Sequence, residues 1–168
     1  MKKPLLRRGP EHELTEAVTP KTILVPTDLG EGADAALEYA CDLARPFGAR
    51  IHLVSAITIP ALGVPELGVA MTGSVVDGMM ADTLQGLEAL VARYTPCGEM
   101  MKPILKSGDP VDIINETARE VGADLIVMTT HGRTGVARWL LGSVAEQVVR
   151  SATIPVLTIH VAPHKAAA

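Results

Sequence analysis

Short apolar runs alternate along the chain with longer segments in which apolar residues recur every three or four positions. The first run, 22–26, is rich in β-branched residues and predicts a buried strand. An amphipathic helix follows it and ends at Gly48, a residue that commonly terminates helices. The expected inner stripe of this helix is Ala33, Ala36, Leu37, Ala40, Leu43, Ala44 and Phe47.

The next strand and helix are separated by a long segment rich in proline and glycine. Residues 50–56 predict the second strand, and a second helix closes at Pro96. The intervening residues 57–80 are interpreted as a surface loop that orders in part onto the start of this helix, and both a binding loop and disorder remain open for it. One face of the helix carries Met80, Leu84, Leu87, Val91 and Tyr94.

A third strand is predicted over 99–106, at an edge of the sheet because Pro103 cannot donate a backbone hydrogen bond. Asp109 and Pro110 then have the character of an N-cap and a first helical residue, and Gly122 that of a stop. The inner stripe of this helix is predicted to be Val111, Ile114, Ala118 and Val121.

Residues 123–130 are apolar at successive positions, as expected for a strand in the middle of a sheet with helices on both faces. A fourth helix is predicted from 144 to 150, and a fifth strand over 155–161. Regular alternation of strands and helices predicts a doubly wound α/β fold with an open parallel sheet.

The chain has 168 residues, of which 48% are hydrophobic, and this suits one domain with a well-buried core. We expect the domain to span 21–162, between flexible tails at 1–20 and 163–168. No apolar run reaches the roughly 20 residues that a membrane span needs, and the basic start lacks a secretory core. These features predict a cytoplasmic protein without a membrane partner.

Charge and cysteine content argue against a nucleic-acid-binding protein and against a metal site. A net charge of −4 and a pI near 5.7 argue against a nucleic-acid partner, which requires a basic face. Cys41 and Cys97 show no metal-ligand spacing, so we expect no metal site and two unpaired, buried thiols.

The clearest candidate for binding chemistry is the glycine-rich stretch that follows the strand at 123–130. Ser143 and Glu146 have the spacing of a capping box, which would start the helix at Val144. A phosphate could rest on the amides of Gly142, Ser143 and Val144, because a helix N-terminus attracts anions. Gly132 would let the chain pass close to the ligand, and Arg133 would add charge-assisted hydrogen bonds. Glycines and capping boxes also occur in connections that bind nothing, so both interpretations stay open.

A second candidate is Asp28, directly after the first strand in the sequence VPTD. A carboxylate at this place can accept hydrogen bonds from ribose hydroxyls or make a polar contact on the adenine side of a nucleotide, and it is equally common as the N-cap of the following helix.

The segments VPTD, GARIHLVSA, GDP, ADLIVMTTHGRTG, WLLGSVAEQVVR and IPVLTI together resemble the universal stress protein family over about residues 21–161. The resemblance implies five strands in the order 3-2-1-4-5 and a nucleotide crevice between the first and fourth. It implies ribose contact by Asp28, an adenine contact by the main chain of Ala56, and phosphate contacts by Gly132, Gly142, Ser143 and Val144. The expected nucleotide-binding residues are Pro26, Thr27, Asp28, Ala56, Met128, Thr129, Gly132, Arg133, Gly142, Ser143 and Val144.

The chain departs from the family pattern in three places, at Thr129, at Ser55 and over the loop 57–80, which aligns poorly with the family. The family motif is Gly, two residues, Gly, nine residues, Gly, then Ser or Thr, and Thr129 stands where its first glycine belongs. The added side chain is expected to weaken binding or shift it toward AMP. Ser55 replaces a histidine that many members carry, with little expected consequence because the adenine contact is made by the main chain.

The resemblance thus implies a protein that binds ATP or AMP, with Mg²⁺ accompanying the phosphates, and that has a regulatory role in the stress response. It also implies a homodimer formed through the strand 155–161. No catalytic motif is present, and slow ATP hydrolysis is left open. The alternative is a dimeric interaction module of the same fold that binds no nucleotide. A phospho-signalling receiver is disfavoured because Asp28 has no acidic neighbour in sequence.

Overall fold

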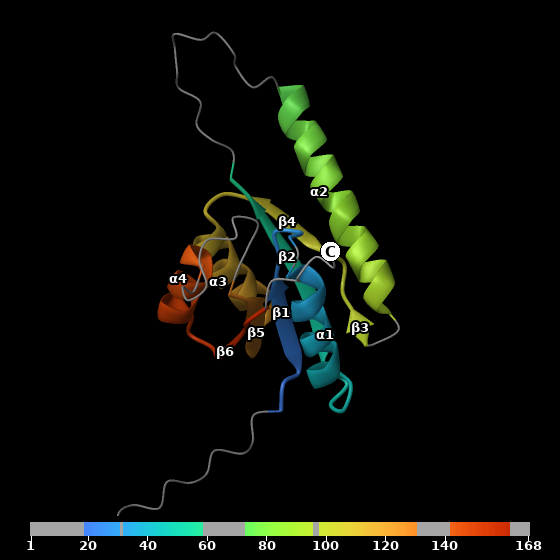
Figure 1. Cartoon of the computed structure of the whole chain (residues 1–168), viewed down its shortest axis with the longest axis vertical. Helices are drawn as coiled ribbons and strands as arrows, with labels where there is room; N and C mark the ends of the chain where they lie inside the picture. The colour runs from blue at the N-terminus through green and yellow to red at the C-terminus, as the bar shows by residue number, and fades with distance from the viewer. Residues whose placement is uncertain (1–18, 31, 59–72, 96–97, 131–141, 162–168) are drawn as a thin grey trace, which may run out of the picture.

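The computed structural model describes residues 19–30, 32–58, 73–95, 98–130 and 142–161 (Figure 1). Strands and helices alternate in these ranges as the sequence predicts. In chain order they are β1 Thr22–Pro26, α1 Ala33–Ala44, β2 Arg50–Ile57, α2 Gly73–Tyr94, β3 Glu99–Met100, β4 Ile104–Ser107, α3 Pro110–Val121, β5 Leu125–Thr129, α4 Ser143–Ser151 and β6 Val156–Ile159.

The described strands form one parallel sheet in the order β3-β2-β1-β5-β6, and β4 also pairs with β2. The predicted doubly wound α/β fold is therefore confirmed, with the predicted third strand at the edge. That strand is split in two, which the sequence did not predict. The amide of Met101 still donates to the carbonyl of Ile51 (2.9 Å), but Pro103 has no N–H, and pairing resumes only at Ile104.

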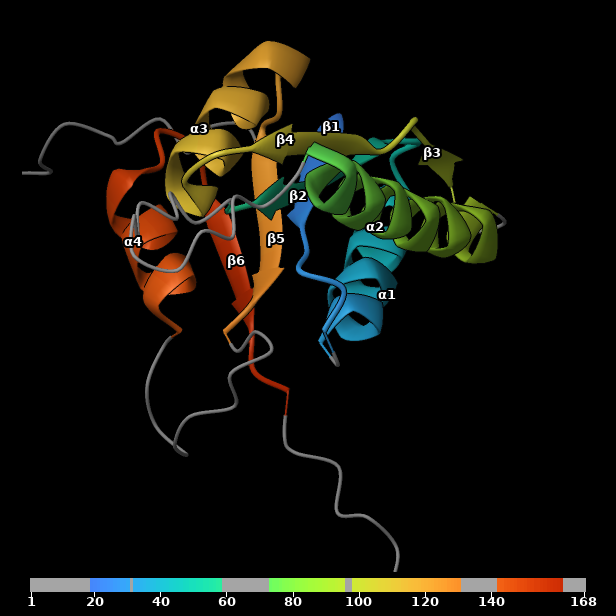
Figure 2. The same cartoon turned by 90° about the horizontal axis from the view of Figure 1, so that it is seen from above.

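Helices cover both faces of the sheet (Figure 2). Because side chains alternate along a strand, Ile23 and Val25 of β1 pack with α1 and α2, while Leu24 packs with α3 and α4. All three side chains are fully buried. β1 thus lies at the centre of the described sheet.

The boundaries of α1 and α2 differ from the predicted ones. α1 ends at Ala44, and Phe47 is 52% exposed, so the predicted inner stripe does not extend that far. Gly48 adopts a positive φ of 62° in the connection that follows. α2 begins at Gly73, within the predicted loop 57–80, and residues 59–72 lie outside the described ranges.

α3 matches its prediction closely. The carboxylate of Asp109 accepts hydrogen bonds from the amides of Val111 (2.9 Å) and Asp112 (3.2 Å), and Pro110 opens the helix. Gly122 ends it in the left-handed conformation, with φ 65°. The predicted stripe shifts slightly, because Ile113 and Thr117 are buried beside Ile114 and Ala118, whereas Val111 and Val121 are only partly buried.

The expectation of unpaired thiols is wrong for Cys41, which is buried in α1 and disulfide-bonded. Cys97 lies outside the described residues. The error has a physical reason: whether two thiols can bond depends on how close the fold brings their Cα atoms, which local sequence spacing does not reveal. Among the described helices, none is long and apolar enough to cross a membrane. The tails predicted at 1–20 and 163–168 fall almost wholly outside the described ranges.

Polar contacts tie the C-terminal end of α2 to the first turn of α1. Asp34 Oδ1 accepts a hydrogen bond from the Tyr94 hydroxyl (3.0 Å) and forms an ion pair with the Arg93 guanidinium (2.8 Å). Burial raises the pKa of Tyr94 to about 12, and the hydrogen bond to Asp34 adds to this effect.

This contact predicts a stability change at alkaline pH. Between the ordinary tyrosine pKa of about 10 and the raised value of about 12, Tyr94 keeps its proton in the folded protein and loses it on unfolding. The free energy of unfolding should therefore fall as the pH rises through this window. Urea unfolding at several pH values should show that the free energy of unfolding falls less steeply with pH in Tyr94→Phe than in the unmodified protein. An identical fall in both proteins would contradict the assignment.

Candidate functional site

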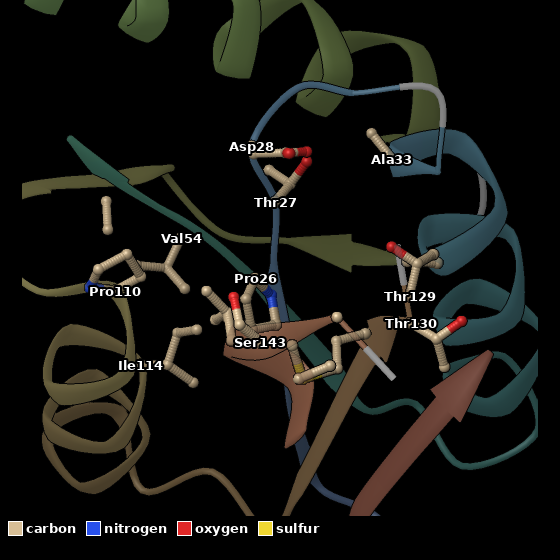
Figure 3. A pocket seen from close by; sticks show the side chains of 16 residues that line it. Pro26, Thr27, Asp28, Ala33, Val54, Pro110, Ile114, Thr129, Thr130 and Ser143 are labelled. Carbon is tan, nitrogen blue, oxygen red and sulfur yellow. The ribbon is translucent and has the colours of Figure 1, made fainter. Parts of the chain in front are cut away.

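A pocket of about 250 Å³ opens at the carboxyl ends of β1, β2 and β5 (Figure 3). β1 and β5 are neighbours in the sheet, although about 100 residues separate them in sequence. The winding direction reverses between them, and ligands of doubly wound folds bind at this point. The described lining residues are Pro26, Thr27, Asp28, Ala33, Ala36, Val54, Ala56, Pro110, Ile114, Met128, Thr129, Thr130, Gly142, Ser143, Val144 and Ala145.

The pocket has an apolar side and a polar side. Val54, Pro110 and Ile114 lie together on one side, whereas Thr129 and Thr130 lie on the other (Figure 3). Asp28 lies between them at the rim, and it is the only charged residue among the described lining residues. This arrangement suits a ligand with a flat apolar part and a hydroxyl-bearing part.

The loop after β1 presents Asp28 to the pocket through its own hydrogen bonds. The Thr27 hydroxyl accepts from the amide of Leu29 (3.0 Å), and Asp28 Oδ1 accepts from the amide of Gly30 (2.9 Å). The N-cap of α1 is Gly32, without a side-chain hydrogen bond, so the interpretation of Asp28 as a helix cap is wrong. Its carboxylate organises the loop.

The N-terminus of α4 also lines the pocket, but the predicted capping box is not formed. The helix begins at Ser143 with Gly142 as its N-cap, and no side chain caps it. The Glu146 carboxylate instead pairs with Arg150 one turn further on (2.8 Å). An i,i+4 ion pair along the helix surface has taken the place of the backward contact to the cap.

The first amides of α4 have no acceptor within the helix, which gives this end a partial positive charge. The amide of Gly142 differs from those after it, because it donates to the carbonyl of Thr130 (2.6 Å). That bond links the end of β5 to the start of α4. The amides of Ser143 and Val144, at the first positions of α4, are therefore the ones in this helix end that suit an anion.

Thr129, the residue that replaces the family's motif glycine, packs against Gly32. A Cβ placed on Gly32 would come within 2.8 Å of Thr129 Oγ1 and 2.9 Å of its Cγ2. Residue 32 therefore leaves the space that the threonine side chain fills. The sequence showed the substitution at 129, but it gave no sign of this accommodation.

The pocket brings together nine of the predicted nucleotide-binding residues. They are Pro26, Thr27, Asp28, Ala56, Met128, Thr129, Gly142, Ser143 and Val144. Gly132 and Arg133 lie outside the described residues. Their contacts to a nucleotide, like those of the nine, stay predictions.

Sequence reasoning missed the apolar wall made by Val54, Pro110 and Ile114. A signal was present, because Pro110 opens a helix that follows an edge strand, and such helix starts lie at the ligand-binding edge of the sheet. Among the described residues, no group of three or more His, Cys, Asp or Glu side chains is placed to hold a metal ion.

Comparisons with known proteins agree with the fold. A family model described as the universal stress protein family matches residues 19–160. This chain belongs to the universal stress protein family. The resemblance carried by VPTD and WLLGSVAEQVVR is thereby confirmed.

Individual relatives cover most of the chain. Universal stress protein MJ0531 of Methanocaldococcus jannaschii is 33% identical over 142 residues, which is 83% of this chain and 81% of the relative. Universal stress protein G of Escherichia coli O157:H7 is 30% identical over 141 residues, covering 83% of this chain and 98% of the relative. The solved structure of MJ0577, a universal stress protein of Methanocaldococcus jannaschii, aligns with a TM-score of 0.77 at 27% identity, covering 87% of this chain and 99% of that one.

The packing of Thr129 on Gly32 predicts a coupled pair of substitutions. Gly32→Ala should lower the free energy of unfolding by about 1–3 kcal/mol, the usual cost of overpacking. Thr129→Ala removes the two atoms that would clash most closely, so the double variant should lose less than Gly32→Ala alone. Urea unfolding of the four proteins measures the coupling. Strictly additive losses would contradict the contact.

Proposed function

We propose that this universal stress protein binds an adenine nucleotide, ATP or AMP, in the pocket between β1 and β5, and that this binding serves a regulatory role in the stress response. The observation that carries the proposal is the meeting of Asp28 with Ser143 and Val144 at one pocket. A carboxylate suited to ribose and a helix N-terminus suited to phosphate were identified from separate parts of the sequence. Their convergence favours a ligand with both groups.

The base would lie on the apolar side, between Val54, Pro110 and Ile114. Ala56 also lines the pocket, and its main chain would contact the polar edge of adenine. These apolar contacts favour a flat ring, whereas a sugar phosphate alone would leave this wall without a partner.

The phosphates would rest on the amides of Ser143 and Val144 and on the Ser143 hydroxyl, with Mg²⁺ bound to the phosphate oxygens. Gly132 and Arg133 are proposed to complete this subsite. The pocket volume of about 250 Å³ is below the roughly 300–1,000 Å³ of sites that enclose a drug-sized ligand. It therefore fits a nucleoside whose phosphates extend along the rim.

A homodimer formed through 155–161 is the second part of the proposal. β6 lies at one end of the described sheet and pairs with β5 on one side. Leu157 on this strand is 37% exposed, at an edge of the described sheet where a further strand could pair. Pairing with a second copy would bury it.

A cytoplasmic location is also proposed, on the resemblance to the family. The disulfide at Cys41 removes the support that two free thiols would have given, because disulfides are rare in the cytosol. The alternative function, a dimeric interaction module without nucleotide, is favoured by one feature, the threonine in place of the motif glycine. The threonine side chain packs onto Gly32, which reduces the weight of this argument against nucleotide binding.

Substitution of Asp28 tests the nucleotide proposal. Asp28→Asn keeps an oxygen that can accept from Gly30 but removes the charge that attracts ribose hydroxyls. The Kd for ATP should rise about tenfold or more by isothermal titration calorimetry, corresponding to about 1.4 kcal/mol. Asp112→Asn is the matched control, because Asp112 lies on α3 and does not line the pocket.

Two results would count against the proposal. Failure of the unmodified protein to bind either ATP or AMP at millimolar concentration would favour the interaction module. An unchanged Kd for ATP in Asp28→Asn, or the same rise in Asp28→Asn and Asp112→Asn, would indicate that Asp28 does not contact the nucleotide in this pocket.

The dimer proposal has its own test at the sheet edge. Leu157→Asp should convert a dimer to a monomer in light scattering coupled to size exclusion, because a carboxylate buried against a second copy would lack a partner. Val75→Asp, at a valine of α2 that is 49% exposed, should leave the mass unchanged. A monomeric unmodified protein, or a dimer that tolerates Leu157→Asp, would contradict the proposed interface.

A further inference from the structure

Leu29, the residue after Asp28, has an unusual backbone conformation. Its φ is 60°, and it is the only residue other than glycine with a positive φ in the part of the chain that the structure describes. The left-handed region is unfavourable for a residue with a Cβ, and glycine is the usual occupant. Some interaction must therefore hold Leu29 in place.

The side chain of Leu29 supplies that interaction by packing on α2 at Gly86. A Cβ placed on Gly86 would come within 2.7 Å of Leu29 Cδ1 and 3.6 Å of its Cδ2. Gly86 is in the interior of a 22-residue helix, where alanine would form the helix better. The absence of a side chain at Gly86 thus leaves space for the side chain of Leu29.

Leu29 lies between the two hydrogen bonds that shape the site loop. Its own amide donates to the Thr27 hydroxyl, and the amide that follows it, on Gly30, donates to Asp28 Oδ1. Movement of Leu29 away from α2 would turn both amides. The carboxylate of Asp28 would then lose the contact that fixes its direction.

We propose that Leu29, seated on Gly86 of α2, is a positioning residue that orients Asp28 toward the ribose hydroxyls of the bound nucleotide. This inference rests on the proposed function and adds a specificity determinant to it. It also assigns a role to α2, which does not itself line the pocket in the described residues.

The test is a pair of alanine substitutions on one helix. Gly86→Ala places a methyl group against Leu29, whereas a Cβ at Gly78 has no neighbour within 4 Å. Both changes favour the helix equally, so Gly78→Ala is a matched control. Each protein is titrated with ATP and with 2′,3′-dideoxy-ATP, which lacks the hydroxyls that Asp28 would contact.

In the unmodified protein and in Gly78→Ala, ATP should bind about tenfold more tightly than the dideoxy analogue. In Gly86→Ala the Kd for ATP should rise toward that of the analogue, while the Kd for the analogue stays unchanged. If the contact between Leu29 and Gly86 only stabilised the fold, Gly86→Ala would raise the Kd for both ligands by the same factor. Thermal unfolding confirms that each variant is folded at the titration temperature.

Substitutions at residue 29 keep the inference testable if Gly86→Ala does not fold. Leu29→Ala should lose the preference for ATP, and Leu29→Met, which keeps an apolar side chain of similar length, should retain it. In the Leu29→Ala background, Gly86→Ala should have no further effect on ATP binding, because the colliding atoms are gone.

The outcomes separate the inference from the proposed function. An unmodified protein that binds neither ATP nor AMP overturns both. A protein that prefers ATP and keeps that preference in Gly86→Ala and Leu29→Ala overturns the positioning role alone. The positioning role is supported if the preference for ATP over the dideoxy analogue is lost in Gly86→Ala and Leu29→Ala and kept in Gly78→Ala and Leu29→Met.

Discussion

The structure depends above all on the pairing of β1 with β5. Ile23 and Leu24 lie opposite Leu125 and Ile126, in a register reinforced where Asp124 accepts hydrogen bonds from the amides at the start of β1. Because both strands run in the same direction, their carboxyl ends stop side by side. The loop that carries Asp28 therefore lines one pocket with the end of β5 and the start of α4, and this pocket forms where the winding reverses.

Glycines around this crevice act mainly by leaving room for the side chains of the site. Gly32, just before α1, leaves room for the side chain of Thr129 in β5. Gly86, in α2, leaves room for the side chain of Leu29 in the loop after β1. The site loop is thereby packed between α1, β5 and α2, and it does not rest on local turn geometry alone. Binding residues on a surface loop are held more firmly when their neighbours are packed in this way.

The sequence predicted the elements with a clear burial pattern, which are the strands β1 and β5, covered on both faces, and α3, with one buried stripe. It placed Pro103 at the edge but missed the break it causes, because a strand that pairs before and after a proline has the same apolar pattern as a continuous one. It missed the start of α2, since residues such as Val75 and Met79 are exposed and follow no core-facing period. Contacts between distant residues, including Leu29 with Gly86 and the disulfide at Cys41, leave no trace in local patterns.

The central claim is that the crevice between β1 and β5 holds an adenine nucleotide. The most direct measurement is a crystal structure of the protein grown with Mg²⁺-ATP. The account predicts electron density with adenine against Pro110 and Ile114, ribose at Asp28, and a phosphate at the amides of Ser143 and Val144. Well-ordered crystals in which this crevice is empty at saturating nucleotide, or in which the nucleotide lies on another surface, would contradict it.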